Sequence, residues 1–281
     1  MALNKKAVLV SLIRRPEDSA VNRASRTIAP STRNSALTRR KEVLNLTTNA
    51  TPTAAAGLLS GIDVSHYQGA IDWRAVARMG IAFAYAKATE GLYPPDAGFA
   101  DNWAGMQDAA ITRGAYHFFR PAASVEVQAD RFLSVVTGFQ AGDLPPMLDL
   151  EEARSGTNSP DEWASIPFTE RLPMALAWLE HVERALGVRP VVYTRLGWLK
   201  PNLGAAGDLV NYPLWIAHYT AAAQPTVPGG WSRWTFWQYS KSGRVAGIYG
   251  PVDLDRFNGS QDDLATLASS AVSSPPQPPA G

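Results

Sequence analysis

Hydrophobic residues along this 281-residue chain fall into short runs from about residue 58 onward. Each run is apolar or aromatic and is bounded by Gly, Pro or polar residues, which is typical of a buried strand. The run from Ile81 to Lys87, with its alternating Ala and aromatic residues, is the clearest example. Six strands are expected, over residues 81–87, 114–119, 146–150, 190–194, 213–217 and 234–239.

Helical patterns lie between several of these runs. Within 169–187, large apolar residues recur at three- and four-residue steps and Gly187 supplies a stop. These apolar residues are Leu172, Leu176, Leu179, Val182 and Leu186. Residues 99–112 and 124–138 show a similar but less regular pattern, so helices are expected there as well.

The alternation of strands and helices over about 200 residues predicts an α/β protein. A parallel sheet of this length is expected to close into a β/α barrel. Connections in the later part are short and carry little helical signal. We therefore predict an irregular, TIM-like β/α barrel with few helices in its C-terminal part.

Aromatic and charged residues are unevenly distributed, and their distribution predicts the domain boundaries. All 27 Phe, Trp and Tyr lie between Tyr67 and Phe257, while residues 1–57 carry ten Lys and Arg against three Asp and Glu. A segment without aromatics has few anchors for a core. We expect a basic, flexible leader over 1–57, a barrel domain over 58–262 and a Pro-rich tail over 263–281.

The N-terminus carries only a weak targeting signal. A basic start is followed by a largely apolar run of seven residues, 7–13, but Arg14-Arg15-Pro16 ends the run without a small-residue cleavage site. No run approaches the ~20 apolar residues that cross a bilayer, so no transmembrane segment is expected. The leader is expected either to stay solvated or to contact an acidic polymer or an assembly partner.

Composition excludes several classes of site. The chain has no cysteine, which rules out disulfide scaffolds, thiol nucleophiles and iron–sulfur clusters. A net charge of +1 and a leader without aromatics argue against nucleic-acid binding. The four histidines lack a metal-site spacing, so neither a metal nor a cofactor is expected. His181 is expected on a helix surface, whereas His66 and His117 are expected to orient carboxylates.

Three acidic clusters follow strand-like runs, around Asp63, around Asp149 and Glu151, and around Asp253. Residues two apart in a strand face the same side, so Asp149 and Glu151 are expected to face one pocket. Like charges so placed disfavour joint ionisation, and one pKa should rise. A protonated acid beside an ionised carboxylate is what cleavage of a glycosidic bond requires. An acidic loop in solvent remains an equally simple interpretation of this motif alone.

Aromatic residues at the expected strand ends favour the first interpretation. Trp and Tyr faces stack on sugar rings, and their N–H and O–H groups donate hydrogen bonds, although most of the eighteen Trp and Tyr must serve the core. An acidic cleft lined with aromatics is typical of a carbohydrate site. The aromatics at strand ends are Tyr116, Tyr193, Trp215, Tyr219, Trp237 and Tyr239.

Eight motifs, in order, then resemble glycoside hydrolase family 25, the Chalaropsis-type lysozymes. They are GIDVSHYQG with IDW (61–73), KATEG (87–91), GAYHF (114–118), LDLE (148–151), VYT (192–194), LWIA (214–217), WQY (237–239) and VDLD (252–255). The resemblance covers about 61–260 and implies a β/α barrel of unusual topology. It also implies cleavage of the β-1,4 bond between N-acetylmuramic acid and N-acetylglucosamine in peptidoglycan.

The resemblance implies roles for individual residues. Glu151 matches the family's general acid, and Asp149 matches the carboxylate that supports the substrate's acetamido group. Asp63 and Asp253 match the other two acids of the cleft, and Asp255 is expected either to support the cleft residues from behind or to be structural. The substrate-binding candidates are Tyr116, Tyr193, Trp215, Gln238 and Glu90.

Asp149 and Glu151, on one face of a strand, lie on the same side of the scissile bond, so Asp149 is poorly placed as a nucleophile. We therefore expect substrate-assisted catalysis with net retention.

Two alternatives stay open. A chitin-type hexosaminidase would need further acids before Asp149, where the chain has Leu144-Pro145-Pro146-Met147-Leu148. A glycan-gripping structural component, such as part of a virion, would need no catalysis. The expected place of action is the bacterial wall, reached by secretion or by phage delivery.

Overall fold

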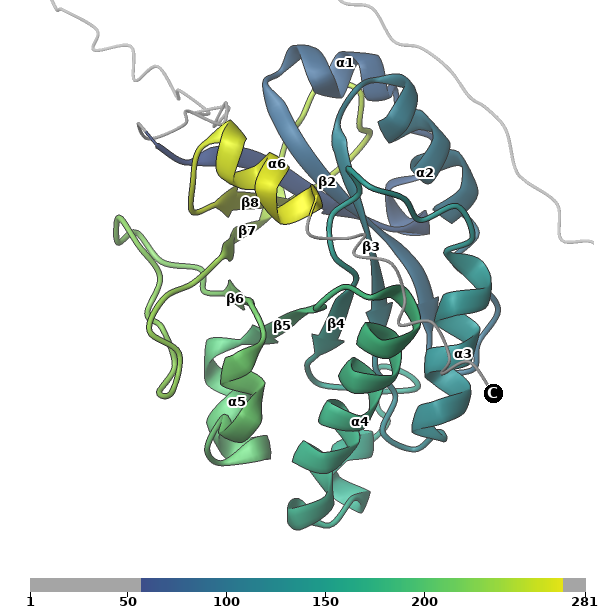
Figure 1. Cartoon of the computed structure of the whole chain (residues 1–281), viewed down its shortest axis with the longest axis vertical. Helices are drawn as coiled ribbons and strands as arrows, with labels where there is room; N and C mark the ends of the chain where they lie inside the picture. Colours follow the sequence, from purple (N-terminus) through teal and green to yellow (C-terminus); the bar gives the residue numbers. More distant parts are fainter. Residues whose placement is uncertain (1–56, 270–281) are drawn as a thin grey trace, which may run out of the picture. The chain divides into compact units, whose positions relative to one another are not determined.

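A computed structural model describes residues 57–269, which form a closed barrel of eight strands (Figure 1). The expected leader before Gly57 and the chain after Ser269 lie outside the described residues. Strand order around the barrel follows the sequence. The strands are β1 (Leu59–Val64), β2 (Ile81–Glu90), β3 (Thr112–Phe118), β4 (Met147–Leu150), β5 (Val191–Arg195), β6 (Leu214–Ala217), β7 (Phe236–Gly243) and β8 (Val252–Phe257).

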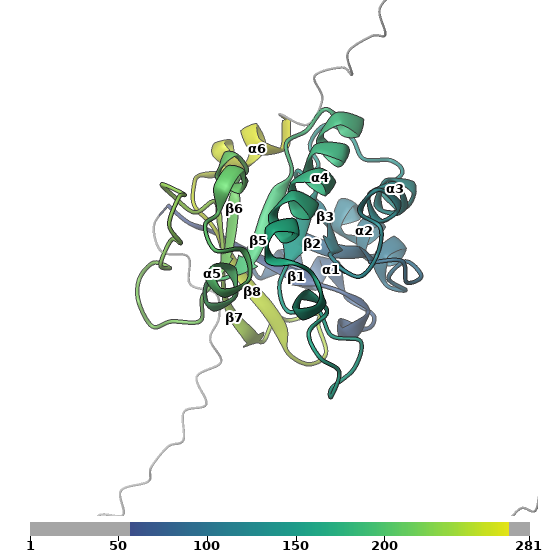
Figure 2. The ribbon, with the colours of Figure 1, turned by 90° about the horizontal axis from the view of Figure 1, so that it is seen from below.

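Helices cover the barrel unevenly. Figures 1 and 2 show α1, α2 and α3 together along one side, with α4 next to α3, whereas the connections from β6 to β7 and from β7 to β8 are loops and α6 lies beside β8. The prediction of few helices in the C-terminal part is confirmed. The helices are α1 (Trp73–Arg78), α2 (Phe99–Asp108), α3 (Val125–Val135), α4 (Phe168–Leu186), α5 (Leu196–Leu203) and α6 (Gln261–Ser269), with short 3₁₀ turns η1 (His66–Gln68), η2 (Glu162–Ser165) and η3 (Gly207–Asn211).

The last strand departs from the expected all-parallel sheet. Strands β1 to β7 run parallel to their neighbours, but β8 pairs antiparallel with both β7 and β1. The connection between β7 and β8 is a short loop without a helix, and a parallel neighbour would need a much longer crossover. As a result, β8 begins at the rim of the barrel where the other strands end.

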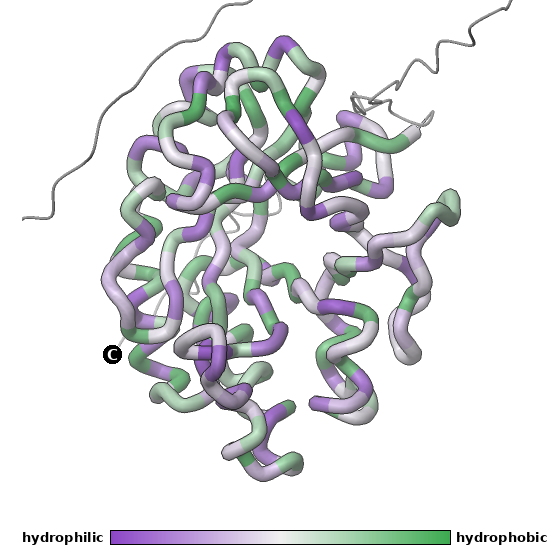
Figure 3. Tube along the Cα trace, turned by 180° about the vertical axis from the view of Figure 1, so that it is seen from behind, coloured by the Kyte–Doolittle hydropathy of each residue, from purple (hydrophilic) through white to green (hydrophobic). Residues whose placement is uncertain are grey.

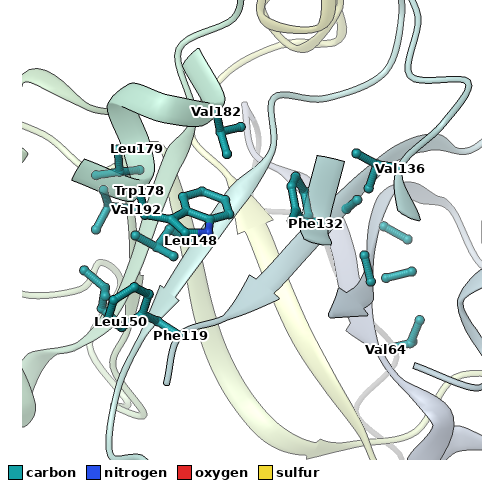
Figure 4. Packing of buried hydrophobic residues seen from close by; sticks show 14 of the residues in the cluster. Val64, Phe119, Phe132, Val136, Leu148, Leu150, Trp178, Leu179, Val182 and Val192 are labelled. Carbon is teal, nitrogen blue, oxygen red and sulfur yellow. The ribbon is translucent and has the colours of Figure 1, made fainter. Parts of the chain in front are cut away.

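The outer core lies between the strands and the helices. Phe132 of α3 and Trp178 of α4 are fully buried and pack with Leu148 of β4, as Figure 4 shows. Gly187 ends α4 in the left-handed conformation at φ 68°, with its N–H on the Glu183 carbonyl. The amphipathic pattern over 169–187 therefore predicted both the helix and its end.

Aromatic side chains fill the inside of the barrel. Phe83 and Tyr85 of β2 pack against Trp215 of β6 and Phe236 of β7, with ring centroids 4.8–6.5 Å apart. All four are fully buried. Their mostly tilted and edge-to-face arrangement is the one that aromatic quadrupoles favour. This cluster closes the barrel interior and forms the floor beneath the rim.

The expected boundary at 262/263 falls inside α6. Leu264 and Ala268 of this helix are buried against the barrel interior, so the folded part extends at least to Ser269. The Pro-rich composition begins only after the helix. Figure 3 shows short hydrophobic stretches interleaved with hydrophilic ones, and no helix among residues 57–269 is long and apolar enough to span a membrane.

Candidate active site

Four acidic side chains meet at one rim of the barrel. Asp63 lies near the end of β1 and Asp149 near the end of β4, and Glu151 is the first residue after β4. Asp253 lies at the start of β8, where it pairs with Asp63 across the antiparallel register. The third cluster, expected at the end of a strand, lies instead at the start of β8, and the reversed direction of this strand brings it to the same rim.

A cavity of about 360 Å³ opens between these acids. All four line it, as do three of the five expected substrate-binding residues, Tyr116, Tyr193 and Gln238. The remaining lining residues are Val64, Ser65, Tyr67, Gln68, Lys87, Phe118, Met147, Arg195, Tyr219 and Lys241.

Alternation along β4 places the two central acids as predicted. Leu148 and Leu150 are fully buried in the outer core against the helices. Met147, Asp149 and Glu151 line the cavity on the opposite face. The indole N–H of Trp163 donates to the Glu151 carbonyl oxygen at 2.9 Å and holds the chain where β4 ends.

Asp149 and Glu151 differ in their surroundings. Asp149 is buried, and its Oδ1 receives no hydrogen bond from any described residue. Burial raises the pKa of Asp149 well above its usual range, the charge of Glu151 raises it further, and Lys87 opposes both. The side chain of Glu151 stays 26% exposed, with the Arg195 Nη1 3.8 Å from its Oε2. Burial raises the pKa of Glu151 too, and Arg195 limits the rise.

Asp63 is held by a hydrogen-bonded network. Gln238 Nε2 donates to Asp63 Oδ2 at 2.7 Å, and Gln238 Oε1 accepts from the hydroxyls of Tyr193 at 2.9 Å and Tyr219 at 2.7 Å. These two donors fix the orientation of the Gln238 amide, so its N–H must face the carboxylate. Burial raises the pKa of Asp63 well above its usual range, as does Asp253 to a smaller extent.

Asp253 lies closer to solvent than Asp63. Burial raises its pKa from 3.8 to about 6, and Lys241 at the cavity mouth partly opposes this. The pKa values of all four carboxyls at the rim are therefore raised. Such groups suit proton transfer near neutral pH.

Two expected substrate-binding residues do not line this cavity. Trp215 is fully buried in the floor, where it packs on Tyr85 and Phe236. Glu90 forms ion pairs with Lys87 and Arg120 outside the cavity. In this structure Trp215 packs within the floor and Glu90 pairs with Lys87.

The two histidines near the motifs were expected to orient carboxylates; His66 contacts one, that of Asp96, whereas His117 does not, and neither contacts a cleft acid. His66 pairs with Asp96, outside the cavity. His117 is fully buried between Thr89 and Gln128, and burial lowers its pKa to about 3. An uncharged His117 is thus part of the packing between sheet and helices, where it stacks on Trp178.

Three cations that line the cavity were not among the expected site residues: Lys87, Arg195 and Lys241. Strand alternation was a usable signal for two of them. Lys87 is two residues after the interior Tyr85, and Arg195 is two residues after Tyr193. Among residues 57–269, no group of three His, Asp, Glu or Cys side chains could hold a metal ion.

Known proteins resemble this chain over the whole barrel. Residues 62–248 match the glycosyl hydrolases family 25. Lysozyme M1 of Streptomyces globisporus is 39% identical over 79% of this chain and 74% of its own length. The N,O-diacetylmuramidase of Chalaropsis sp. is 33% identical over 75% of this chain and 99% of its own.

A solved structure shows the same architecture. The bacterial lysozyme from Streptomyces coelicolor superposes with a TM-score of 0.71 at 38% identity, covering 78% of this chain and all of that one. The resemblance noted from eight motifs is thereby confirmed on both sequence and fold. With its acidic rim on such a barrel, the chain belongs to glycosyl hydrolases family 25.

Proposed function

We propose that this family 25 glycoside hydrolase is a muramidase that cleaves the β-1,4 bond between N-acetylmuramic acid and N-acetylglucosamine in peptidoglycan. The names of its relatives, lysozyme and N,O-diacetylmuramidase, support this substrate. The cavity supports it too, because tyrosines and carboxyls around about 360 Å³ suit a polar ring with an apolar face.

One observation carries the mechanism: the buried Oδ1 of Asp149 has no donor among the described residues, beside a second acid on the same face. A buried carboxylate oxygen without a partner is costly. The N–H of a 2-acetamido group supplies the missing donor. Such a contact favours the ionised form of Asp149. When only one of the two carboxyls holds a proton, that proton then lies on Glu151.

The reaction then proceeds in two steps. The acetamido carbonyl oxygen attacks C1 while the bond from C1 to the leaving oxygen breaks and Glu151 gives that oxygen its proton. Ionised Asp149 orients the amide and offsets the positive charge of the oxazolinium ring. Water next attacks C1, the ring opens, and Glu151 takes the water's proton. Intramolecular attack of this kind lowers the barrier by about 7–11 kcal/mol relative to a bimolecular step.

Glu151→Gln tests the role of the acid. The amide keeps the side-chain shape but gives no acidic proton, so release of reducing ends from purified cell walls should fall about 10²–10⁴-fold. Glu152→Gln is the matched control, because Glu152 is exposed and pairs with Arg154 outside the cavity. A Glu151→Gln enzyme with more than half of the wild-type rate would remove Glu151 from this role.

The stereochemistry of the product tests the route. Two inversions at C1 leave the first-formed product as the β-anomer, which proton NMR detects before mutarotation. An initial α-anomer would indicate direct attack by water instead. A protein that binds walls but releases no reducing ends from them would support the glycan-gripping role.

The place of action follows from the substrate. A peptidoglycan hydrolase acts on the bacterial cell wall, and we propose secretion or phage delivery as its route there. The basic residues of 1–57 suit contact with an acidic wall polymer or an assembly partner. Pelleting of the full chain and of a chain lacking 1–57 with purified walls measures this contribution.

A further inference from the structure

One buried acid has no part in the mechanism above. Asp255 lies on β8 between Gly61 of β1 and Gln238 of β7, two residues deeper in the barrel than Asp253. It is fully buried, and no N–H or O–H group of residues 57–269 donates to either carboxyl oxygen. Within this part of the chain, no Lys, Arg or His forms an ion pair with it.

The groups facing Asp255 come from every neighbouring strand. Asp63 approaches from β1 and Asp253 precedes it on β8, and both are acids. The indole of Trp215 on β6 lowers the pKa of Asp255 and so opposes its protonation, although the indole N–H makes no hydrogen bond of ordinary geometry with either oxygen. On β7, Gln238 donates to Asp63 instead. Among the described residues, the side chains closest to the Asp255 carboxyl are therefore the Asp63 carboxyl and the Trp215 indole.

Two carboxyls in contact need a proton between them. An unpaired carboxylate in a dry interior costs many kcal/mol, so such a group takes up a proton instead. Asp63 already accepts from Gln238 at Oδ2 and faces the cavity. The carboxyl of Asp255 is one layer deeper, walled by Trp215, and is the one better suited to stay neutral.

We propose that Asp255 is a buried neutral carboxylic acid that donates its proton to Asp63 in a hydrogen bond and is a positioning residue of the active site. Burial raises the pKa of Asp255 well above its usual range, and the charges of Asp63 and Asp253 raise it further. The same hydrogen bond lowers the pKa of Asp63 and so favours its ionised form. A carboxylic acid kept neutral by an apolar site so that it can donate is a known device in enzymes.

With this hydrogen bond, the side chains around Asp63 hold one another in fixed orientations. Asp255 and Gln238 hold Asp63 from two sides, and the hydroxyls of Tyr193 and Tyr219 hold Gln238. Asp63 thus presents its carboxyl to the cavity in a fixed orientation. This role deepens the proposed function and rests on it for the kinetic readout alone.

Infrared spectroscopy tests the protonation state without any activity. The wild-type minus Asp255→Asn difference spectrum at pH 7 should contain the C=O stretch of a neutral carboxylic acid, shifted in D₂O. Asp108→Asn, the same change at an exposed position on α2, should show only the loss of a carboxylate band. A carboxylate band in the Asp255→Asn difference would overturn the proposal, even if the enzyme proved not to be a muramidase.

Kinetics test the positioning role. An amide still donates to Asp63, so Asp255→Asn should keep kcat within about threefold and leave the midpoints of the pH profile unchanged. Asp255→Leu has no donor and should lose about tenfold in kcat, the worth of one hydrogen bond to a charged group. If Asp255→Asn shifts the profile to lower pH, Asp255 is ionised in the wild type and the proposal fails. Should Asp255→Leu not fold, the infrared result and the Asp255→Asn profile decide alone.

Discussion

Replacing Asp253 with Asn should stabilise the fold and disable the site. Asp253 lies at the cavity mouth beside Asp63, and burial raises its pKa from 3.8 to about 6. Ionisation of Asp253 at neutral pH is therefore less favourable in the folded protein than in the unfolded chain, which lowers the free energy of unfolding. An amide of the same shape removes this cost, and active-site residues commonly trade stability for activity in this way.

The magnitude follows from the difference in proton affinity. The change from 3.8 to about 6 corresponds to about 3 kcal/mol, at about 1.4 kcal/mol for each tenfold change. Solvent at the cavity mouth and coupling to Asp63 reduce this, so we expect a gain of about 1–3 kcal/mol at pH 7.5. Between the two pKa values the folded state binds more protons than the unfolded state, so the wild type loses stability as pH rises through this range.

Urea denaturation of wild type and Asp253→Asn at a series of pH values measures this difference. The gain should be full above pH 6 and should disappear toward pH 3, where both side chains are neutral. Asp263→Asn is the control and should lower the free energy of unfolding at neutral pH, because two hydrogen bonds from Ser260 lower the pKa of Asp263 and so stabilise its ionised form. A gain for Asp253→Asn that persists at pH 3, or no gain at pH 7.5, would refute the electrostatic argument.

Three further outcomes are expected. Deleting residues 1–57 should leave a soluble domain that melts cooperatively and releases reducing ends from walls. Lys87→Met removes a charge that lowers the pKa of Asp149, so the pH optimum of kcat/KM should move upward; an unchanged optimum would mean that Lys87 does not act on the acids. In Gly61→Ala the new Cβ would lie 2.2 Å from the buried Phe83 ring, and thermal unfolding should report a loss of about 1–3 kcal/mol.

Strand alternation explains why much of the site could be predicted from the sequence. A period of two is enough to place Asp149 and Glu151 on one face and Leu148 and Leu150 on the other. The same rule indicates that Lys87 faces the barrel interior, because it lies two residues after the interior Tyr85. Local patterns also predicted α4 and its end at Gly187, because propensity, amphipathicity and a left-handed glycine agree there.

Properties that depend on distant parts of the chain could not be predicted in this way. The direction of β8 depends on how a short loop closes the barrel, and no residue of β8 encodes it alone. Trp215 belongs to the floor because Tyr85 and Phe236 reach it from other strands. Glu90 is paired by Arg120, thirty residues later, so its distance from the cavity follows from tertiary contacts.

The reversed strand β8 also determines when the enzyme can become active during its synthesis. Asp63 belongs to the first strand and Asp253 to the last, and they meet only when β8 inserts between β7 and β1. Contacts so far apart in sequence form late, after the intervening chain has folded. A nascent chain on the ribosome therefore has Asp149 and Glu151 early but lacks the opposite wall. Barrel closure and assembly of the acidic rim are one event, so an incompletely synthesised chain cannot have a complete active site.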